Sequence, residues 1–192
     1  MTVHRLRLIA LLAPSLALAA CAGGGGGYRA VSDVPVRIGP PYKVRGETYT
    51  PRTQPGYDML GYATWYGNES GNRTASGEKF RADWITAAHR DLPLPTYLEV
   101  TSLDSGERII VRVNDRGPFG QSEKILDLSK GAAEQLGVRA KGKAPVRVRV
   151  IEPERKDRER LMKGKPARSL PRLSAKALTS LRAQFSRGVG TL

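Results

Sequence analysis

Short β-rich segments separated by turn residues fill the middle of the chain, and they limit its fold more than any other feature. Residues 97–101 and 108–113 flank an Asp104-Ser105-Gly106 turn, which predicts a hairpin. Residues 145–151 alternate valine with arginine, as expected of a strand with one buried face. Shorter apolar runs predict three more strands, at residues 61–66, 84–88 and 125–128.

One short helix is expected among these strands. Ser129 is placed to cap its N-terminus, and Gly137 ends it after Leu136. Six short strands with one helix fit a small, mainly β barrel better than a doubly wound sheet. The barrel is expected to occupy residues 57–152.

The N-terminus has the features of an export signal. Arg5 and Arg7 precede an uncharged stretch that ends at Ala20, which predicts a secretory signal peptide over residues 1–20. The stretch is shorter than the roughly 20 apolar residues of a membrane-spanning helix. The mature protein is therefore expected to have no transmembrane segment.

Cys21 is the only cysteine of the chain, so no disulfide can form within it. With the preceding Leu18-Ala19-Ala20 it resembles a bacterial lipobox, which implies a lipidated Cys21 at the mature N-terminus. The alternative is an ordinary cleavage site with a chance cysteine. Ala22 follows where an aspartate would favour retention, and the resemblance to Gram-negative lipoproteins thus implies the periplasmic face of the outer membrane.

Residues 21–56 are expected to tether the domain. Glycines fill positions 23–27 and predict a flexible linker, whereas prolines and aromatic residues between 34 and 55 predict an extended arm without helix that lies against the barrel.

The net charge of +14 is confined to the ends of the chain. Residues 57–152 hold 14 basic and 13 acidic residues, whereas the tail 153–192 holds 11 basic and 3 acidic residues. A nearly neutral domain on an exported chain argues against nucleic acid as a partner. Anionic polymers of the envelope are the candidate partners of the tail. Its apolar residues from 173 to 185 recur at helical spacing, and a solvated tail is favoured over a membrane-surface helix.

Asp115 is the first candidate for chemistry. The β-branched run that ends at Val113 is followed by Asn114-Asp115-Arg116, and Gly117-Pro118 ends the strand. A side chain at a strand end is held firmly and still reaches solvent. The alternative is an aspartate that only caps the turn and pairs with Arg116.

Five segments together resemble the rare lipoprotein A (RlpA) family, with the match covering about residues 42–151. The resemblance implies a double-psi β-barrel and a lytic transglycosylase without cofactor. The implied substrate is peptidoglycan whose glycan strands have lost their stem peptides. The segments are Gly61-Tyr62-Ala63-Thr64-Trp65-Tyr66-Gly67, residues 73–80 (RTASGEKF), Thr86-Ala87-Ala88-His89 with Leu92-Pro93-Leu94-Pro95, residues 111–119, and Ile125-Leu126-Asp127-Leu128-Ser129.

The resemblance places the family's important residues on Glu78, His89 and Asp115, with Asp115 as the catalytic acid. Each has an alternative, because Glu78 can lie on a polar loop and His89 can be a buried, hydrogen-bonded structural residue. No metal is expected, since the domain has no second histidine and no cysteine.

Other residues are candidates for binding the sugar. Trp65, Tyr66 and Phe80 stack on sugars or belong to the core. Asn114 and Arg116 flank the acid, and Asp127 is assigned to structure.

Three departures from the family keep rival functions open. Residues 68–73 replace the usual Phe-His-Gly-Arg, Arg81 stands where many members have aspartate, and the tail is too short for the family's SPOR domain. The rivals are an expansin-like protein that binds peptidoglycan without cleaving it and a structural envelope protein. Other cell-wall or division proteins are candidate partners.

A single carboxyl group suffices for this chemistry. The C6 hydroxyl of N-acetylmuramic acid (MurNAc) attacks its own C1, so no water has to be positioned. One residue can protonate the leaving oxygen and then deprotonate that hydroxyl. This requires the pKa of Asp115 to be raised above about 3.9, by burial or by Glu78. Arg116 opposes that shift, so it is expected to point away or to bind substrate.

Overall fold

A computed structural model of the protein describes residues 31–67, 71–188 and 190–191. The predicted signal peptide, the lipidation site at Cys21 and the glycine linker lie outside these residues. Within the described part of the chain, no helix combines the length and the apolar character needed to cross a membrane.

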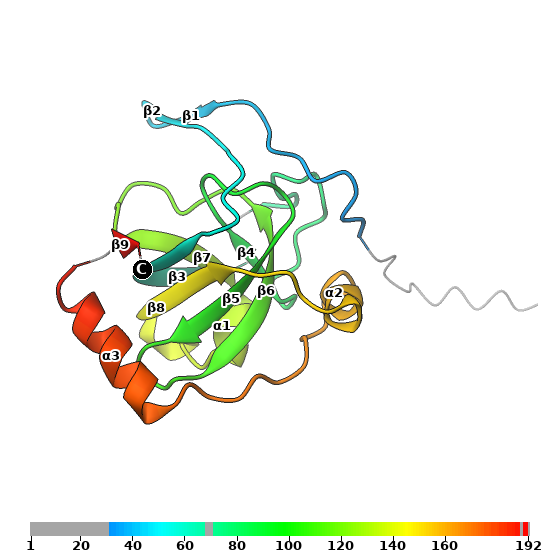
Figure 1. Cartoon of the computed structure of the whole chain (residues 1–192). Helices are drawn as coiled ribbons and strands as arrows, with labels where there is room; N and C mark the ends of the chain where they lie inside the picture. Colours follow the sequence, from blue (N-terminus) through cyan, green and yellow to red (C-terminus); the bar gives the residue numbers. More distant parts are fainter. Residues whose placement is uncertain (1–30, 68–70, 189, 192) are drawn as a thin grey trace, which may run out of the picture.

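Six strands close into a barrel, which confirms the mainly β fold (Figure 1). Each predicted strand is present. Around the barrel the strands follow the order β7-β4-β6-β5-β8-β3, and β3 pairs with β7 to complete the circle. Their bounds are β3 Asp58–Tyr66, β4 Thr86–Ala88, β5 Thr96–Ser102, β6 Arg108–Asp115, β7 Lys124–Ser129 and β8 Lys143–Val150.

Two of the strand pairs are parallel, and both contain a register shift. β3 runs parallel to β7 with the shift between Tyr62 and Ala63. β4 runs parallel to β6 with the shift between Ala87 and Ala88, beside Asp115. Such bulges turn the following side chains, and this one lies where the candidate acid emerges.

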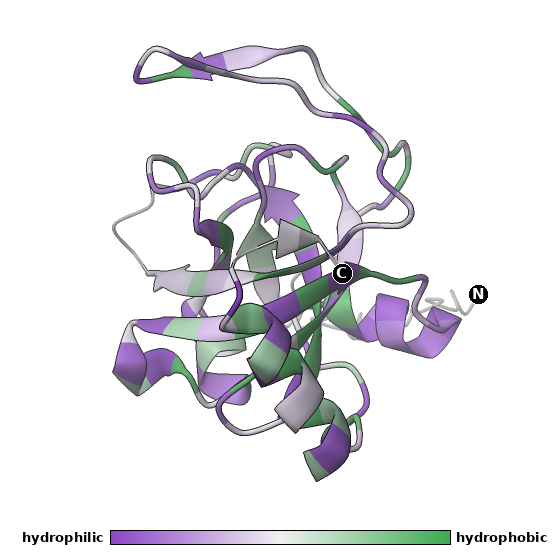
Figure 2. Ribbon diagram, turned by 60° about the vertical axis from the view of Figure 1, so that its left-hand side comes forward, coloured by the Kyte–Doolittle hydropathy of each residue, from purple (hydrophilic) through white to green (hydrophobic). Residues whose placement is uncertain are grey.

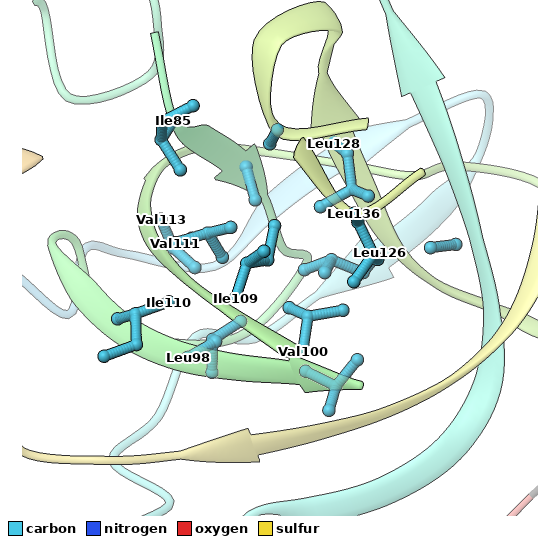
Figure 3. Packing of buried hydrophobic residues seen from close by; sticks show 14 of the residues in the cluster. Ile85, Leu98, Val100, Ile109, Ile110, Val111, Val113, Leu126, Leu128 and Leu136 are labelled. Atoms are coloured by element: carbon cyan, nitrogen blue, oxygen red, sulfur yellow. The ribbon is translucent and has the colours of Figure 1, made fainter. Parts of the chain in front are cut away.

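The interior is filled by aliphatic side chains from all six strands (Figure 3). Leu98, Val100, Val111 and Val113 are fully buried, and the residues between them in β5 and β6 are buried as well. Gly61 is required by this packing, because a Cβ there would lie 2.7 Å from Cγ2 of Ile125.

Helix α1, Lys130–Gln135, covers one end of the barrel. The side chain of Ser129 accepts a hydrogen bond from the amide of Ala132, as predicted for its N-cap. Gly137, with a φ of 72°, follows the last turn, and a short 3-10 helix, η2 (Arg139–Lys141), leads into β8.

The arm contains a hairpin that the sequence analysis did not predict. β1 (Tyr42–Val44) and β2 (Glu47–Tyr49) pair in antiparallel fashion across Arg45 and Gly46, whose φ angles are 51° and 87°. Both values suit a tight hairpin turn, but arginine is unusual at its first position, so the sequence signal was weak. The hairpin projects above the barrel (Figure 2).

The basic tail is folded onto the barrel, and the expectation of a solvated tail is not met. Helix α2 spans Arg155–Leu161 and helix α3 spans Ala175–Phe185. Leu161 joins the main core, and Leu181 packs on Leu60 and Leu103. A final short strand, β9 (Gly190–Thr191), pairs with β3. The apolar residues of α3 therefore pack against the protein itself, with Leu181 buried and its apolar neighbours partly buried.

Much of the tail's charge is paired internally. Four of its arginines form ion pairs with carboxylates of the tail or of the barrel: Arg155 with Glu159, Arg158 with Glu152, Arg168 with Glu154, and Arg172 with Glu107.

Candidate active site

Asp115 ends β6 and is held by the loop before β4. Its Oδ1 accepts hydrogen bonds from the amides of Ala75 and Arg116, both at 2.8 Å. Its carbonyl accepts from the amide of His89 at 3.0 Å. These bonds fix the backbone and one carboxylate oxygen. The carboxyl lines a cavity of about 220 Å³.

Burial raises the pKa of Asp115 above its ordinary value. The amides of Ala75 and Arg116 and the charge of Arg116 act in the opposite direction, and the charge of Glu78 adds to the rise. The net direction is the one that proton donation requires.

Glu78 belongs to a buried ion-pair network. Its two carboxylate oxygens each lie 2.8 Å from a terminal nitrogen of Arg112, and its Oε2 also accepts from Nδ2 of Asn114 at 2.8 Å. Arg112 is 1 % exposed, and its Nε donates to Oδ1 of Asp33 at 2.8 Å. The charge of Glu78 is thus fixed beside Asp115, with its oxygens already occupied.

His89 is buried and neutral. Its Nδ1 accepts hydrogen bonds from the amides of Asp91 and Leu92, so the proton is assigned to Nε2, which lies 3.0 Å from the hydroxyl of Tyr57. Burial, with Arg90 and Arg116 nearby, lowers the pKa of His89 to about 3. This geometry is that of a buried, hydrogen-bonded structural histidine, the alternative given for His89 in the sequence analysis.

Tyr66 and Asp127 line the same cavity as Asp115. Tyr66 is 8 % exposed, and its ring stacks on that of Phe80 with centroids 5.2 Å apart. One face of the ring is therefore covered, and the hydroxyl oxygen is itself buried. Burial and the charges of Asp115 and Asp127 raise the pKa of Tyr66, which keeps the hydroxyl protonated as a donor.

The remaining predicted residues are divided between the site and its surroundings. Trp65 lies on the opposite face of β3 from Tyr66, where its Nε1 donates to the carbonyl of Arg139 at 3.1 Å. It packs partly against the core and does not line the Asp115 cavity. Arg116 lines the cavity, but its guanidinium donates to the carbonyls of His89, Leu92 and Ile38.

Sequence reasoning missed three residues around the acid. Asp127 was assigned to structure; it accepts a hydrogen bond from the hydroxyl of Thr64 and also faces the cavity, because β7 runs parallel to β3. Arg112 stood within an apolar strand, and a buried arginine there was a signal for a buried carboxylate. Asp33 lies 79 residues from Arg112, and no sequence pattern links them.

Among the described residues, no group of three or more histidine, cysteine, aspartate or glutamate side chains is arranged to hold an ion.

Known proteins resemble the barrel over most of its length. Residues 58–148 match a family described as lytic transglycolase. The endolytic peptidoglycan transglycosylase RlpA of Pseudomonas aeruginosa strain UCBPP-PA14 is 50 % identical over 115 residues, which are 59 % of this chain and 33 % of that protein. The protein of the same name from Rickettsia bellii is 38 % identical over 122 residues, or 62 % of this chain and 53 % of the relative. The chain thus spans a third to about half of these relatives.

Solved structures give more distant similarities. A point mutant of the expansin of Clavibacter michiganensis in complex with cellohexaose is 24 % identical, with a TM-score of 0.41 over 50 % of this chain and 51 % of that one. Streptomyces papain inhibitor is 20 % identical, with a TM-score of 0.42 over 53 % of this chain and all of the inhibitor. The sequence match and the closed barrel together confirm the resemblance noted above: residues 58–148 are similar in sequence to the lytic transglycolase family and form a closed barrel.

Proposed function

We propose that this chain is an endolytic lytic transglycosylase of peptidoglycan. It cleaves the β-1,4 bond between MurNAc and N-acetylglucosamine (GlcNAc) in strands without stem peptides and leaves 1,6-anhydro-MurNAc ends. One observation carries this proposal. A domain similar to the lytic transglycolase family places a carboxyl group of raised pKa, that of Asp115, at a strand end in a cavity.

The reaction needs one group that exchanges a proton twice. Protonated Asp115 gives its proton to the glycosidic oxygen while the bond between that oxygen and C1 of MurNAc breaks. The C6 hydroxyl of the same MurNAc bonds to C1, and its proton passes to the Asp115 carboxylate, which restores the acid. GlcNAc leaves with a free 4-hydroxyl, and no water is consumed.

Glu78 and His89 support Asp115 without exchanging protons in this mechanism. The oxygens of Glu78 are held by Arg112 and Asn114, so its role is a fixed negative charge that raises the pKa of Asp115. His89 positions the acid through its backbone amide, and its buried ring anchors the segment that follows β4. Asp127, which lines the same cavity, offers a carboxylate acceptor to sugar hydroxyls.

The protein is proposed to work in the bacterial envelope. Its resemblance to cell-wall enzymes and the lipobox-like Cys21 support a lipid-anchored location, on the periplasmic face of the outer membrane of a Gram-negative cell. A Cys21→Ser variant is expected to leave the membrane fraction after export, and one that stays membrane-bound contradicts the anchor. Cell-wall or division proteins are proposed as further partners.

The direct test is to incubate the full-length protein with peptide-free glycan strands and to weigh the products. Anhydro-MurNAc ends, lighter by one water than hydrolysed ends, support the proposal. Hydrolysed ends contradict it in favour of a glycosidase. Intact strands that sediment with the protein contradict it in favour of a binding protein, the function of the expansin-like alternative.

A further inference from the structure

Two guanidinium groups line the cavity that holds Asp115, and they differ in what they already bind. Arg116 is committed to the fold, because it donates to three backbone carbonyls, at 2.6 Å from Leu92 and at 3.2 Å from His89 and Ile38. Arg73 enters the cavity from the loop before β4, the same loop whose Ala75 amide holds the acid.

Most hydrogen-bond donors of the Arg73 guanidinium have no partner among the described residues. Its Nη1 donates to the carbonyl of Gly77 at 2.9 Å, which fixes the direction of the side chain. No ion pair within 4.0 Å joins it to a carboxylate of the described residues, although Asp115 and Asp127 line the same cavity. An arginine has five donor hydrogens in a rigid fork, so most of those of Arg73 remain for a ligand.

We propose that Arg73 binds the lactyl carboxylate of MurNAc and thereby selects strands whose stem peptides have been removed. The inference rests on the proposed function, since it concerns the same cavity and the same sugar. Arg73 is then the residue that distinguishes peptide-free strands from strands that carry stem peptides.

The chemistry of MurNAc explains why a guanidinium serves this purpose. Its 3-O-lactyl group ends in a free carboxylate when no peptide is attached, and in a neutral amide when one is. A carboxylate accepts two parallel hydrogen bonds from a guanidinium, whereas an amide offers one oxygen and no charge. A cavity of about 220 Å³ is smaller than a site for a whole drug-sized ligand, so its size suits one sugar with its substituent rather than a longer part of the strand.

The test compares two substrates made from one preparation of peptide-free strands. In the first the lactyl carboxylates are free, and in the second they are converted to methylamides. Release of anhydro ends is measured with the full-length wild type, Arg73→Gln, Arg73→Lys and Lys79→Gln. Lys79 is a matched control, because it is an exposed cation in the same loop, bridged to Arg73 through the backbone, and it does not line the cavity.

Wild type and Lys79→Gln are expected to cleave the free-acid strands with a kcat/KM about tenfold higher than that for the methylamide strands, mainly through a lower KM. The methylamide strands lack one charge-assisted hydrogen bond at a site open to solvent, and a factor of this size is expected from that loss. Arg73→Gln is expected to lose this preference by losing activity on the acid alone, and Arg73→Lys to recover part of it. An unchanged preference in Arg73→Gln overturns the inference while the enzyme remains active. If the wild type releases no anhydro ends from either substrate, the proposed function is overturned instead. The role of Arg73 is then tested separately, by measuring how strongly each of the two kinds of strand co-sediments with Asp115→Asn. Equal binding of the two overturns the inference.

Discussion

At the scale of single residues, the carboxyl group of Asp115 balances burial and the charge of Glu78 against two amides and Arg116, and its pKa is raised. Only the protonated form can donate to the glycosidic oxygen. Turnover is therefore expected to fall as the pH rises through this raised pKa, and Asp115→Asn is expected to lower kcat by about 10²- to 10⁴-fold. The rate of anhydro-end formation against pH measures both. An Asn variant with wild-type turnover shows that another group is the acid.

His89 links the stability of the protein to pH. Its pKa of about 3 lies below the unfolded value of about 6.5, so the unfolded chain binds the additional proton. Its contribution to stability is complete above pH 6.5 and is lost as the pH falls toward 3. The free energy of unfolding is expected to drop by about 2 kcal/mol between pH 7.5 and 5.0 from this residue. Urea denaturation at the two pH values measures the drop.

The matched variant is His89→Gln, which keeps a donor and an acceptor but cannot titrate. Its unfolding free energy should be lower than that of the wild type at pH 7.5, and the difference should shrink at pH 5.0. Since Asp115 is present in both proteins, its own titration cancels in the comparison. Equal pH dependence in both proteins contradicts the assignment.

The sequence predicted the residues whose signal is local and missed those whose role depends on closure of the barrel. Asp115 follows a β-branched strand and precedes Gly117-Pro118, so its place at a strand end was readable. Asp127 also lies near a strand end, but it faces the cavity only because β7 pairs with β3, 63 residues from Thr64. The stacking of Tyr66 on Phe80, which hides the ring from a sugar, is likewise a long-range effect.

At the scale of elements, the arm before the barrel takes part in holding the site. Asp33 is the second carboxylate on Arg112, and it also accepts a hydrogen bond from the hydroxyl of Tyr97. Asp33→Asn leaves the buried guanidinium with one anionic partner. The free energy of unfolding is expected to fall by about 3 kcal/mol, as for a buried ion pair that loses one member. Urea denaturation measures the loss.

Glu47→Gln is the control for Asp33→Asn, since it removes one carboxylate from the same arm at an exposed position on β2. Its free energy of unfolding should stay within about 0.5 kcal/mol of the wild type. If the two variants unfold at the same urea concentration, the arm contributes nothing to the barrel through Asp33.

The elements themselves were predictable to different degrees. The hairpin strands β5 and β6, the alternating strand β8 and the serine-capped helix α1 were predicted correctly, because a turn signal, β-branched runs, alternation and a cap are all local features of the sequence. The hairpin of β1 and β2 was not, since Arg45 gives no turn signal.

At the scale of the whole molecule, the matched domain of residues 58–148 is not the complete folding unit. α2 contributes Leu161 to the main core, and the chain after it turns at Gly164 beneath Trp84. A Cβ at position 164 would lie 2.3 Å from the Trp84 ring, so the tail approaches the barrel as closely as side chains allow. The excess positive charge of residues 153–192 therefore lies on a folded part of the protein, and four arginines of this tail are paired with carboxylates.

This arrangement predicts that the tail stabilises the barrel. Leu161→Ala removes a fully buried side chain, and it is expected to lower the free energy of unfolding by about 2–5 kcal/mol, with a smaller loss for Leu181→Ala on the satellite cluster of Leu60 and Leu103. Lys176→Ala, exposed on the same helix as Leu181, should change it by less than about 0.5 kcal/mol. Thermal and urea unfolding are followed by tryptophan fluorescence, to which Trp84 contributes; because Gly164 of the tail packs against Trp84 of the barrel, the signal reports both. If Leu161→Ala unfolds like Lys176→Ala, the tail is an appendage and the barrel stands alone. A loss confined to Leu161→Ala and Leu181→Ala means that the tail is part of the core, because side chains from outside the matched domain then fill its interior.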